Sequence, residues 1–204
     1  MEPDAVEIRV LGCLIEKQRT TPDVYPLTLN ALRLACNQST NRDPVVDYDE
    51  NTIRSGIERL VQRKWATLAS WSNRRSMKYR QTLDGALGLD DGEISVLAVL
   101  MLRGAQTPGE LKTRTERLHA FDATDALDAT LRRLLERELV ASLGKQPGQR
   151  EERYAHLLSA AADDEVEPSP LVEARVEPDR LERLERELAE LREEVRSLRK
   201  ELGA

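Results

Sequence analysis

The chain has 204 residues, of which 40% are apolar, 33% are charged and only 3% are aromatic, and its formal net charge is −6. So few aromatic side chains favour helical layers over a β-sandwich. No run approaches the ~20 apolar residues that span a bilayer, and the N-terminus lacks the basic segment of a signal peptide, so we expect a cytoplasmic protein without membrane contact.

The first predicted element is a helix over residues 4–18. Val6, Val10 and Leu14 lie on one face at helical spacing, and Ile8 and Leu11 widen that face well beyond a single stripe. A helix that is apolar on two sides must be covered on two sides. We expect its own domain to supply one cover, and either a second domain or another subunit to supply the other.

Residues 20–26 form a loop with two prolines, and a helix is predicted for 27–37 with Leu27, Ala31, Leu34 and Ala35 facing inward. Another helix follows over 49–64, with Asp49 as its N-cap. Strand-like runs at 65–71 and 76–83 flank a basic tip at 72–75. Three helices followed by a β-hairpin is the order of a winged-helix domain.

The same order then recurs. A helix is predicted for 91–104, and the next begins with Thr107 as N-cap, Pro108 at the first position and Glu110 closing a capping box. A third helix over 122–138 precedes a strand, a glycine-containing turn and a second strand. Because the two units share little sequence identity, this is a repeat of architecture only.

The expected fold is therefore mainly α with small β-hairpin wings, an α+β class, built from two tandem winged-helix domains at 1–84 and 85–158. A linker with three prolines and many acids covers 159–178, and a coiled-coil helix covers 179–204.

The apolar residues of the last segment alternate at spacings of three and four, which is a heptad repeat. They are Leu181, Leu184, Leu188, Leu191, Val195, Leu198 and Leu202. A parallel pair would set residues of opposite charge against each other, such as Glu187 against Arg192 of a second copy. The pattern predicts dimerisation through this helix, and the alternative is that the helix packs on its own chain.

The candidate binding chemistry lies in the first unit, whose charge differs from that of the tail. Residues 159–204 hold 8 Lys/Arg against 14 Asp/Glu, whereas residues 52–82 hold eight against one. In a winged helix, residues 52–82 cover the recognition helix and the wing, which meet the major groove and the DNA backbone. The candidate DNA-binding residues are Asn51, Thr52, Arg54, Ser55, Arg59, Gln62, Arg74, Arg75 and Lys78. The alternative is a solvated basic face.

The third helix of the second unit carries Asp122, Asp125 and Asp128 near its start, where acids would repel phosphate. This unit is better suited to dimerisation or to binding a protein partner. The acids themselves are explained by the preference of helix N-termini for Asp, so no metal site is predicted. Cys13 and Cys36 are expected to be buried core residues.

Three stretches of the sequence resemble the YceH-like family of uncharacterised bacterial proteins. They are LIEKQRTTPDVYPLTLNALRLACNQSTNRDPVVDYDE, TPGELKTRTERLHAF and REERYAHLL, within residues 4–158. The resemblance implies a tandem winged-helix fold and carries no activity, ligand or catalytic residue with it.

Signatures of catalysis are missing, since there is no glycine-rich phosphate loop, nucleophile motif or HExxH. We therefore expect no enzyme activity, no catalytic residue and no cofactor. The predicted function is a dimeric, DNA-binding transcriptional regulator that uses the third helix and the wing of the first unit. The alternative is a protein-interaction scaffold that does not bind DNA directly.

Overall fold

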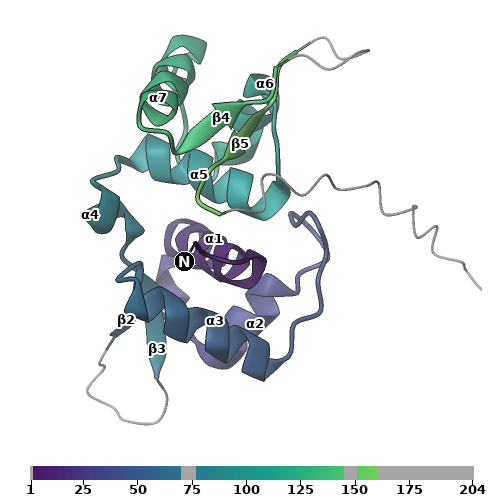
Figure 1. The fold of residues 1–204 in the computed structure, drawn as a ribbon, viewed down its shortest axis with the longest axis vertical. Coiled ribbons are helices and arrows are strands. Elements are labelled where there is room, and N and C mark those ends of the chain that lie inside the picture. Colours follow the sequence, from purple (N-terminus) through teal and green to yellow (C-terminus); the bar gives the residue numbers. More distant parts are fainter. Residues whose placement is uncertain (1, 70–76, 145–150, 160–204) are drawn as a thin grey trace, which may run out of the picture. The chain divides into compact units, whose positions relative to one another are not determined.

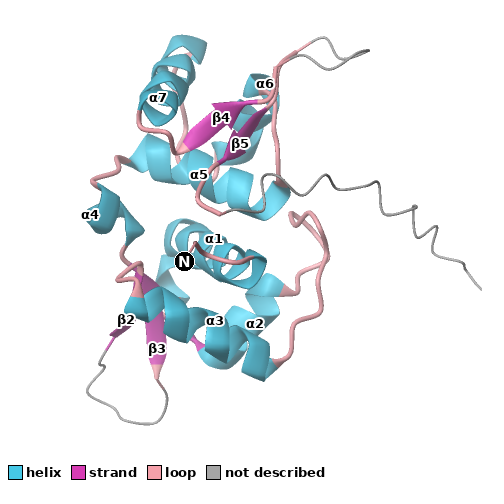
Figure 2. Ribbon diagram, in the orientation of Figure 1, coloured by secondary structure: helices cyan, strands magenta, loops and turns pink. Residues whose placement is uncertain are grey.

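The computed structural model describes residues 2–69, 77–144 and 151–159, and the statements below concern these residues (Figure 1). The predicted coiled-coil helix and nearly all of the predicted linker lie outside them. The chain is mainly helical with small antiparallel hairpins, as Figure 2 shows, which confirms the α+β class. Residues 1–163 form one compact unit.

The first half of this unit alternates helices with short strands. Its elements are α1 (Ala5–Thr20), a 3-10 turn η1 (Pro22–Val24), β1 (Leu27–Thr28), α2 (Leu29–Cys36), α3 (Glu50–Gln62), β2 (Ala66–Ala69) and β3 (Lys78–Gln81). The three strands form an antiparallel sheet in the order β1-β3-β2, in which Leu27 pairs with Tyr79 and Leu68 also pairs with Tyr79.

The short helix α4 (Leu83–Leu87) connects this half to the next. There follow α5 (Asp91–Arg103), α6 (Pro108–Thr115), α7 (Thr124–Glu136), β4 (Val140–Ser142) and β5 (Tyr154–His156). The strands β4 and β5 form an antiparallel pair. Gln106 makes an isolated antiparallel bridge to Tyr154. Thus the order helix, extended residue, helix, helix, hairpin occurs twice, and we call residues 4–81 the first repeat and 90–156 the second repeat.

The strand β1 was missed from the sequence, where the helix was predicted to begin at Leu27. The helix starts two residues later, because the Thr28 side chain accepts a hydrogen bond from the Ala31 N–H and caps it. The buried face is therefore Leu32, Ala35 and Cys36, while Leu34, predicted to face inward, is 56% exposed.

The wide apolar surface of α1 is covered by α5, from the second repeat. Ile8, Leu11 and Ile15 are buried, as is every residue of α5 from Gly92 to Leu102. The two helices cross closely at Gly12, where an added Cβ would lie 3.0 Å from the Leu102 side chain. At the end of α1, Arg19 pairs with Asp91 at 2.5 Å. The second cover expected for this helix is thus the second repeat of the same chain.

No helix in the described ranges combines the length and the apolar character needed to cross a bilayer.

Candidate nucleic-acid interface

The helix α3 presents one buried face and one free face. It begins where the Asp49 carboxylate accepts a hydrogen bond from the Thr52 N–H at 2.7 Å, which confirms Asp49 as the N-cap. Ile53, Ile57 and Leu60 are fully buried on its inner side. These three anchors fix which side chains of the helix remain available to a ligand.

The exposed residues of α3 are Glu50, Asn51, Ser55, Glu58 and Gln62, and they make up its free face. Asn51, Ser55 and Gln62 were predicted as contacts to DNA, and none of the three makes a side-chain hydrogen bond that would commit it within the described part of the chain. Thr52 and Arg54 are half-buried at the border of this face, and Arg54 pairs with Glu50 at 2.7 Å.

Arg59 does not lie on this free face, contrary to the expectation from the sequence. Its guanidinium donates to Glu7 at 3.0 Å and to Asp4 at 2.5 Å, both at the start of α1. Arg63, one turn later, donates to the other oxygen of Glu7 at 2.9 Å. The Glu7 side chain is only 2% exposed, so the two arginines hold α3 against α1.

Of the predicted wing residues, Lys78 lies on β3 and is half-buried, whereas Arg74 and Arg75 fall outside the described residues. Arg80 lies two positions further along the same strand and is exposed, while the intervening Tyr79 is buried. Because side chains alternate along a strand, Lys78 and Arg80 lie on the same face, away from Tyr79.

The basic window is therefore smaller than its composition indicates. Arg54, Arg59 and Arg63 are engaged in ion pairs. Among the basic side chains of this window that the structure describes, Lys64, Lys78 and Arg80 are in no ion pair.

The ion pairs that hold α3 recur in the second repeat. Arg133 of α7 donates to Glu93 at 3.0 Å and to Asp90 at 2.6 Å, and Arg137 lies 3.3 Å from the other oxygen of Glu93. In both repeats the acceptor glutamate closes a capping box with the aspartate three residues before it. This cluster was not predicted from the sequence, although the Asp-x-x-Glu and Arg-x-x-x-Arg spacings occur in both repeats.

This shared cluster aligns the third helices of the two repeats. Arg59 is equivalent to Arg133. The turn after each helix is equivalent as well, because Lys64 and Glu138 both adopt a positive φ, of 64° and 54°. The alignment then matches Asn51 with Asp125, Arg54 with Asp128, Ser55 with Ala129, Glu58 with Arg132 and Gln62 with Glu136. At these five positions the first repeat has one acid and one base, whereas the second has three acids and one base.

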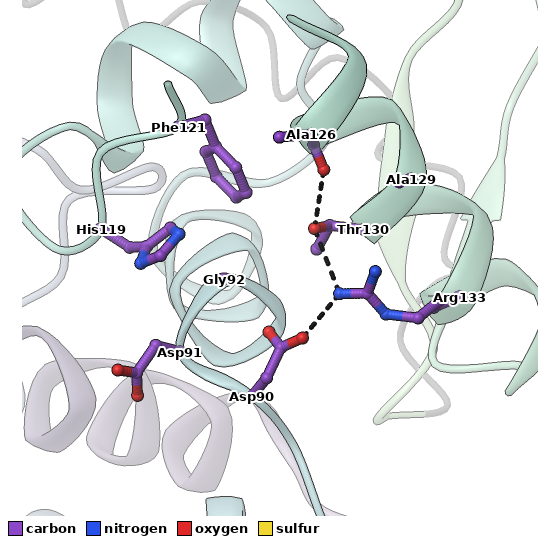
Figure 3. Close-up of a pocket in the computed structure, with 9 residues that line it drawn as sticks. All are labelled: Asp90, Asp91, Gly92, His119, Phe121, Ala126, Ala129, Thr130 and Arg133. Atoms are coloured by element: carbon purple, nitrogen blue, oxygen red, sulfur yellow. Dashed lines mark hydrogen bonds and ion pairs between the residues drawn. The ribbon is translucent and has the colours of Figure 1, made fainter. Parts of the chain in front are cut away.

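An open pocket of about 640 Å³ lies in the second repeat, and Gly92 and Thr130 both line it (Figure 3). In the first repeat Val6 of α1 packs against Gly56 of α3, where an added Cβ would lie only 2.9 Å from the valine. In the second repeat, Gly92 of α5 is equivalent to Val6 and Thr130 of α7 is equivalent to Gly56. The larger side chain of this pair is therefore on the third helix in the second repeat and on the first helix in the first repeat. Figure 3 shows that the Phe121 ring lies beside Gly92, and an added Cβ there would be 3.1 Å from it.

The two cysteines are free and buried, as predicted. The hydrogen bond that the Cys36 thiol donates to Cys13 raises the pKa of Cys36, and burial raises it further, so this thiol is neutral. In the segments that the structure describes, no group of three or more His, Cys, Asp or Glu side chains could hold a metal ion.

The sequence matches a known protein family over most of its length. The family described as "Protein of unknown function, DUF480" matches residues 4–149. The chain belongs to this family. A UPF0502 protein of Pelobacter propionicus is 46% identical over 95% of this chain and 92% of its own length. The UPF0502 protein YceH of Escherichia fergusonii is 42% identical over 99% of this chain and 98% of its own length. The resemblance to the YceH-like family is thereby confirmed.

Proposed function

We propose that this member of the family is a non-enzymatic DNA-binding protein with two tandem winged-helix domains, in which α3 and the β2–β3 hairpin of the first repeat contact DNA. The order of elements supports the winged-helix assignment in both repeats. In such domains the third helix enters the major groove and the hairpin contacts the flanking backbone.

The chemistry of the free face suits this role. Asn51 and Gln62 carry amides, which can bond bidentately to adenine, and Ser55 can bond to a base or a phosphate. Lys78 and Arg80 lie on the adjacent hairpin and can neutralise phosphates without first breaking an ion pair.

The observation that carries the proposal is the difference between the two third helices on a common framework. The same ion-pair cluster fixes α3 and α7 against the first helix of each repeat. On that framework the positions of Asn51 and Arg54 are taken by Asp125 and Asp128 in α7. Fold alone requires no such difference, so the comparison of α3 with α7 supports the first repeat, rather than the second, as the one that binds DNA.

The proposal is tested with a labelled duplex of mixed sequence whose binding is measured by fluorescence anisotropy across 50–200 mM salt. Replacing Lys78 and Arg80 by Gln should weaken binding for all sequences and reduce the salt slope by about 2, because each lost phosphate contact reduces it by about 1. Arg117→Gln with Arg132→Gln removes the same charge from the second repeat and should leave the slope unchanged. No binding at 50 mM salt, or equal effects of the two double variants, would contradict the proposal.

A second candidate function rests on the acidic surface of α7. Asp125, Asp128 and Glu136 are exposed and lie one or two helical turns apart, which suits a basic protein segment. In this alternative the tandem repeats are a scaffold without direct DNA contact. It requires that the wild-type protein fails to bind DNA in the anisotropy experiment, and that binding of a poly-lysine peptide is lost with Asp125→Asn and Asp128→Asn.

A further inference from the structure

A second recessed site lies where the loop before α3 meets the end of α5. One cavity of about 400 Å³ is walled by the loop at Asn41–Asp43, the turn after α5, the helix α6 and Arg153. A neighbouring cavity of about 260 Å³ shares Asn41, Arg103 and Arg114 with it. Together they lie within the volume range of small-molecule sites in proteins.

Arginine dominates the charge of these walls. The two cavities are lined by five guanidiniums and three carboxylates. The arginines are Arg42, Arg103, Arg114, Arg117 and Arg153, and the acids are Glu16, Asp43 and Glu110. The surplus of two positive charges matches the charge of a phosphate monoester near neutral pH.

Two of the three acids are already engaged. Glu16 pairs with the fully buried Arg42 side chain at 2.6 Å. Glu110 receives Arg153 at 3.0 Å and Arg114 at 3.3 Å, and it also accepts the Thr107 N–H as part of the cap of α6. Neither acid is left to neutralise a further cation.

Of the five arginines, Arg103 and Arg117 form no ion pair with a carboxylate in the described residues, and of these two only Arg103 lines both cavities. Arg103 lies in the last turn of α5 and donates to the side-chain oxygen of Asn41. Burial lowers its pKa, and the nearby Arg114 and Arg42 lower it further, although Glu16 and Glu110 act in the opposite direction. A bound anion beside Arg103 would offset the burial and the neighbouring positive charges that disfavour its charged guanidinium.

We propose that this pocket binds a small molecule through a phosphate group, held by the Arg103 and Arg114 guanidiniums. A guanidinium offers parallel N–H donors that match the oxygens of phosphate. A small ligand fits better than a nucleic-acid backbone, because the cavity is walled by four separate segments and one of its arginines is fully buried.

The site joins both repeats, since Asn41 and Arg42 belong to the first and Arg103 and Arg114 to the second. The Asp43 N–H also donates to the Leu102 carbonyl at 2.8 Å, which ties the loop to α5. A ligand here would contact both repeats at once and stabilise their packing. This inference does not depend on DNA binding, and its test contains no DNA.

The test is a titration of the isotope-labelled full chain with inorganic pyrophosphate at constant ionic strength, followed by amide chemical shifts. The proposal expects saturable shifts at Asn41 and Gly104. Arg103→Gln and Arg114→Gln should each weaken binding at least about tenfold. Arg132→Gln removes an exposed arginine of α7 and should leave binding unchanged. A dispersed amide spectrum for each variant shows that it is folded, and Arg114→Gln decides the question if Arg103→Gln does not fold.

Three results would overturn the proposal. The first is the lack of any saturable shift in the folded wild type at millimolar pyrophosphate. The second is an equal loss of binding in Arg132→Gln, which would indicate non-specific attraction. The third is saturable binding of citrate without binding of pyrophosphate, which would assign the pocket to carboxylates.

Discussion

Glu7 and Glu93 hold equivalent positions in the two repeats, and each receives two guanidiniums from the third helix of its own repeat. The Glu7 side chain is 2% exposed and the Glu93 side chain 5%. Burial alone would raise the pKa of Glu7, but hydrogen bonds from Arg63 and Arg59 outweigh it and hold the pKa below its ordinary value of 4.5. Glu7 therefore acts as a charged anchor between the first and third helices, and Glu93 makes the equivalent ion pairs in the second repeat.

Replacing Glu7 by Gln should lower the free energy of unfolding by about 2 kcal/mol at pH 7. Removal of one partner of a buried ion pair costs about 3–5 kcal/mol, and here the arginines are partly solvated, which reduces the loss. Because the folded pKa lies below the unfolded one, the contribution of Glu7 is complete above about pH 4.5 and is lost as the pH falls through the folded value. Urea denaturation measures this loss, and Glu58→Gln, at an exposed position of α3, is the control. A wild-type unfolding curve for Glu7→Gln would refute the anchor role.

The sequence was sufficient for the features that depend on local periodicity. The caps at Asp49 and Thr107 and the buried faces of the third helices follow from spacing alone. By contrast, Glu7 and Arg63 are 56 residues apart, and no local pattern reports such a contact. Helical spacing places Arg59 near the free face and so predicts a DNA contact, and only the fold shows that it pairs with Glu7 and Asp4. The two residues of β1 are too few for any alternation to be visible.

A second prediction concerns the crossing of α1 and α3. An added Cβ at Gly56 would lie 2.9 Å from Val6, so Gly56→Ala should destabilise the chain by about 1–3 kcal/mol despite the better helix propensity of alanine. Val6→Ala in the same chain should restore part of the loss, because it removes the clashing methyl groups. Gly85→Ala, where nothing lies within 4 Å, should be neutral or stabilising. Thermal unfolding of the four variants decides this, and additive effects of Val6→Ala and Gly56→Ala would contradict the contact.

The close crossing of α1 and α5 predicts that the two repeats unfold together. Both tryptophans, Trp65 and Trp71, lie within residues 4–81 of the sequence, and Trp65 packs against the core. Tryptophan fluorescence therefore follows the first repeat, whereas circular dichroism reports both repeats. The two probes should give one coincident transition in the wild type. Gly12→Leu should separate them, because the added side chain collides with Leu102 and forces the helices apart. Coincident curves in Gly12→Leu would show that this crossing does not couple the repeats.

His156 predicts a second pH dependence. Burial lowers the pKa of His156 to about 4, and its Nδ1 has no hydrogen-bond partner in the described structure. Since the unfolded chain binds a proton near pH 6.5 and the folded chain does not, stability falls as the pH drops between these values, by about 2 kcal/mol from pH 7.5 to pH 5. His156→Phe should remove this part of the drop, whereas His119→Gln should keep it. A drop of unchanged size in His156→Phe would contradict the assignment.

Dimerisation through residues 179–204 remains a prediction from the heptad spacing. Replacing Leu188 and Leu191 by Asp places charges in the predicted seam, so sedimentation equilibrium should show a halved mass. Exchanging Glu190 and Glu193, outside the seam, for Gln should keep the dimer. An unchanged mass in the Leu188→Asp, Leu191→Asp variant would place the helix on its own chain or the dimer contact elsewhere.

The most direct test of the central claim gives α3 the charges of α7. Asn51→Asp, Arg54→Asp and Gln62→Glu copy the residues found at the equivalent positions of the second repeat, on a helix that the Glu7 anchor still holds. In the anisotropy experiment at 100 mM salt, this variant should lose DNA binding, while Asp125→Asn with Asp128→Asn should retain it. Equal affinity of the α3 variant and the wild type would contradict the claim that the first repeat binds DNA through this face.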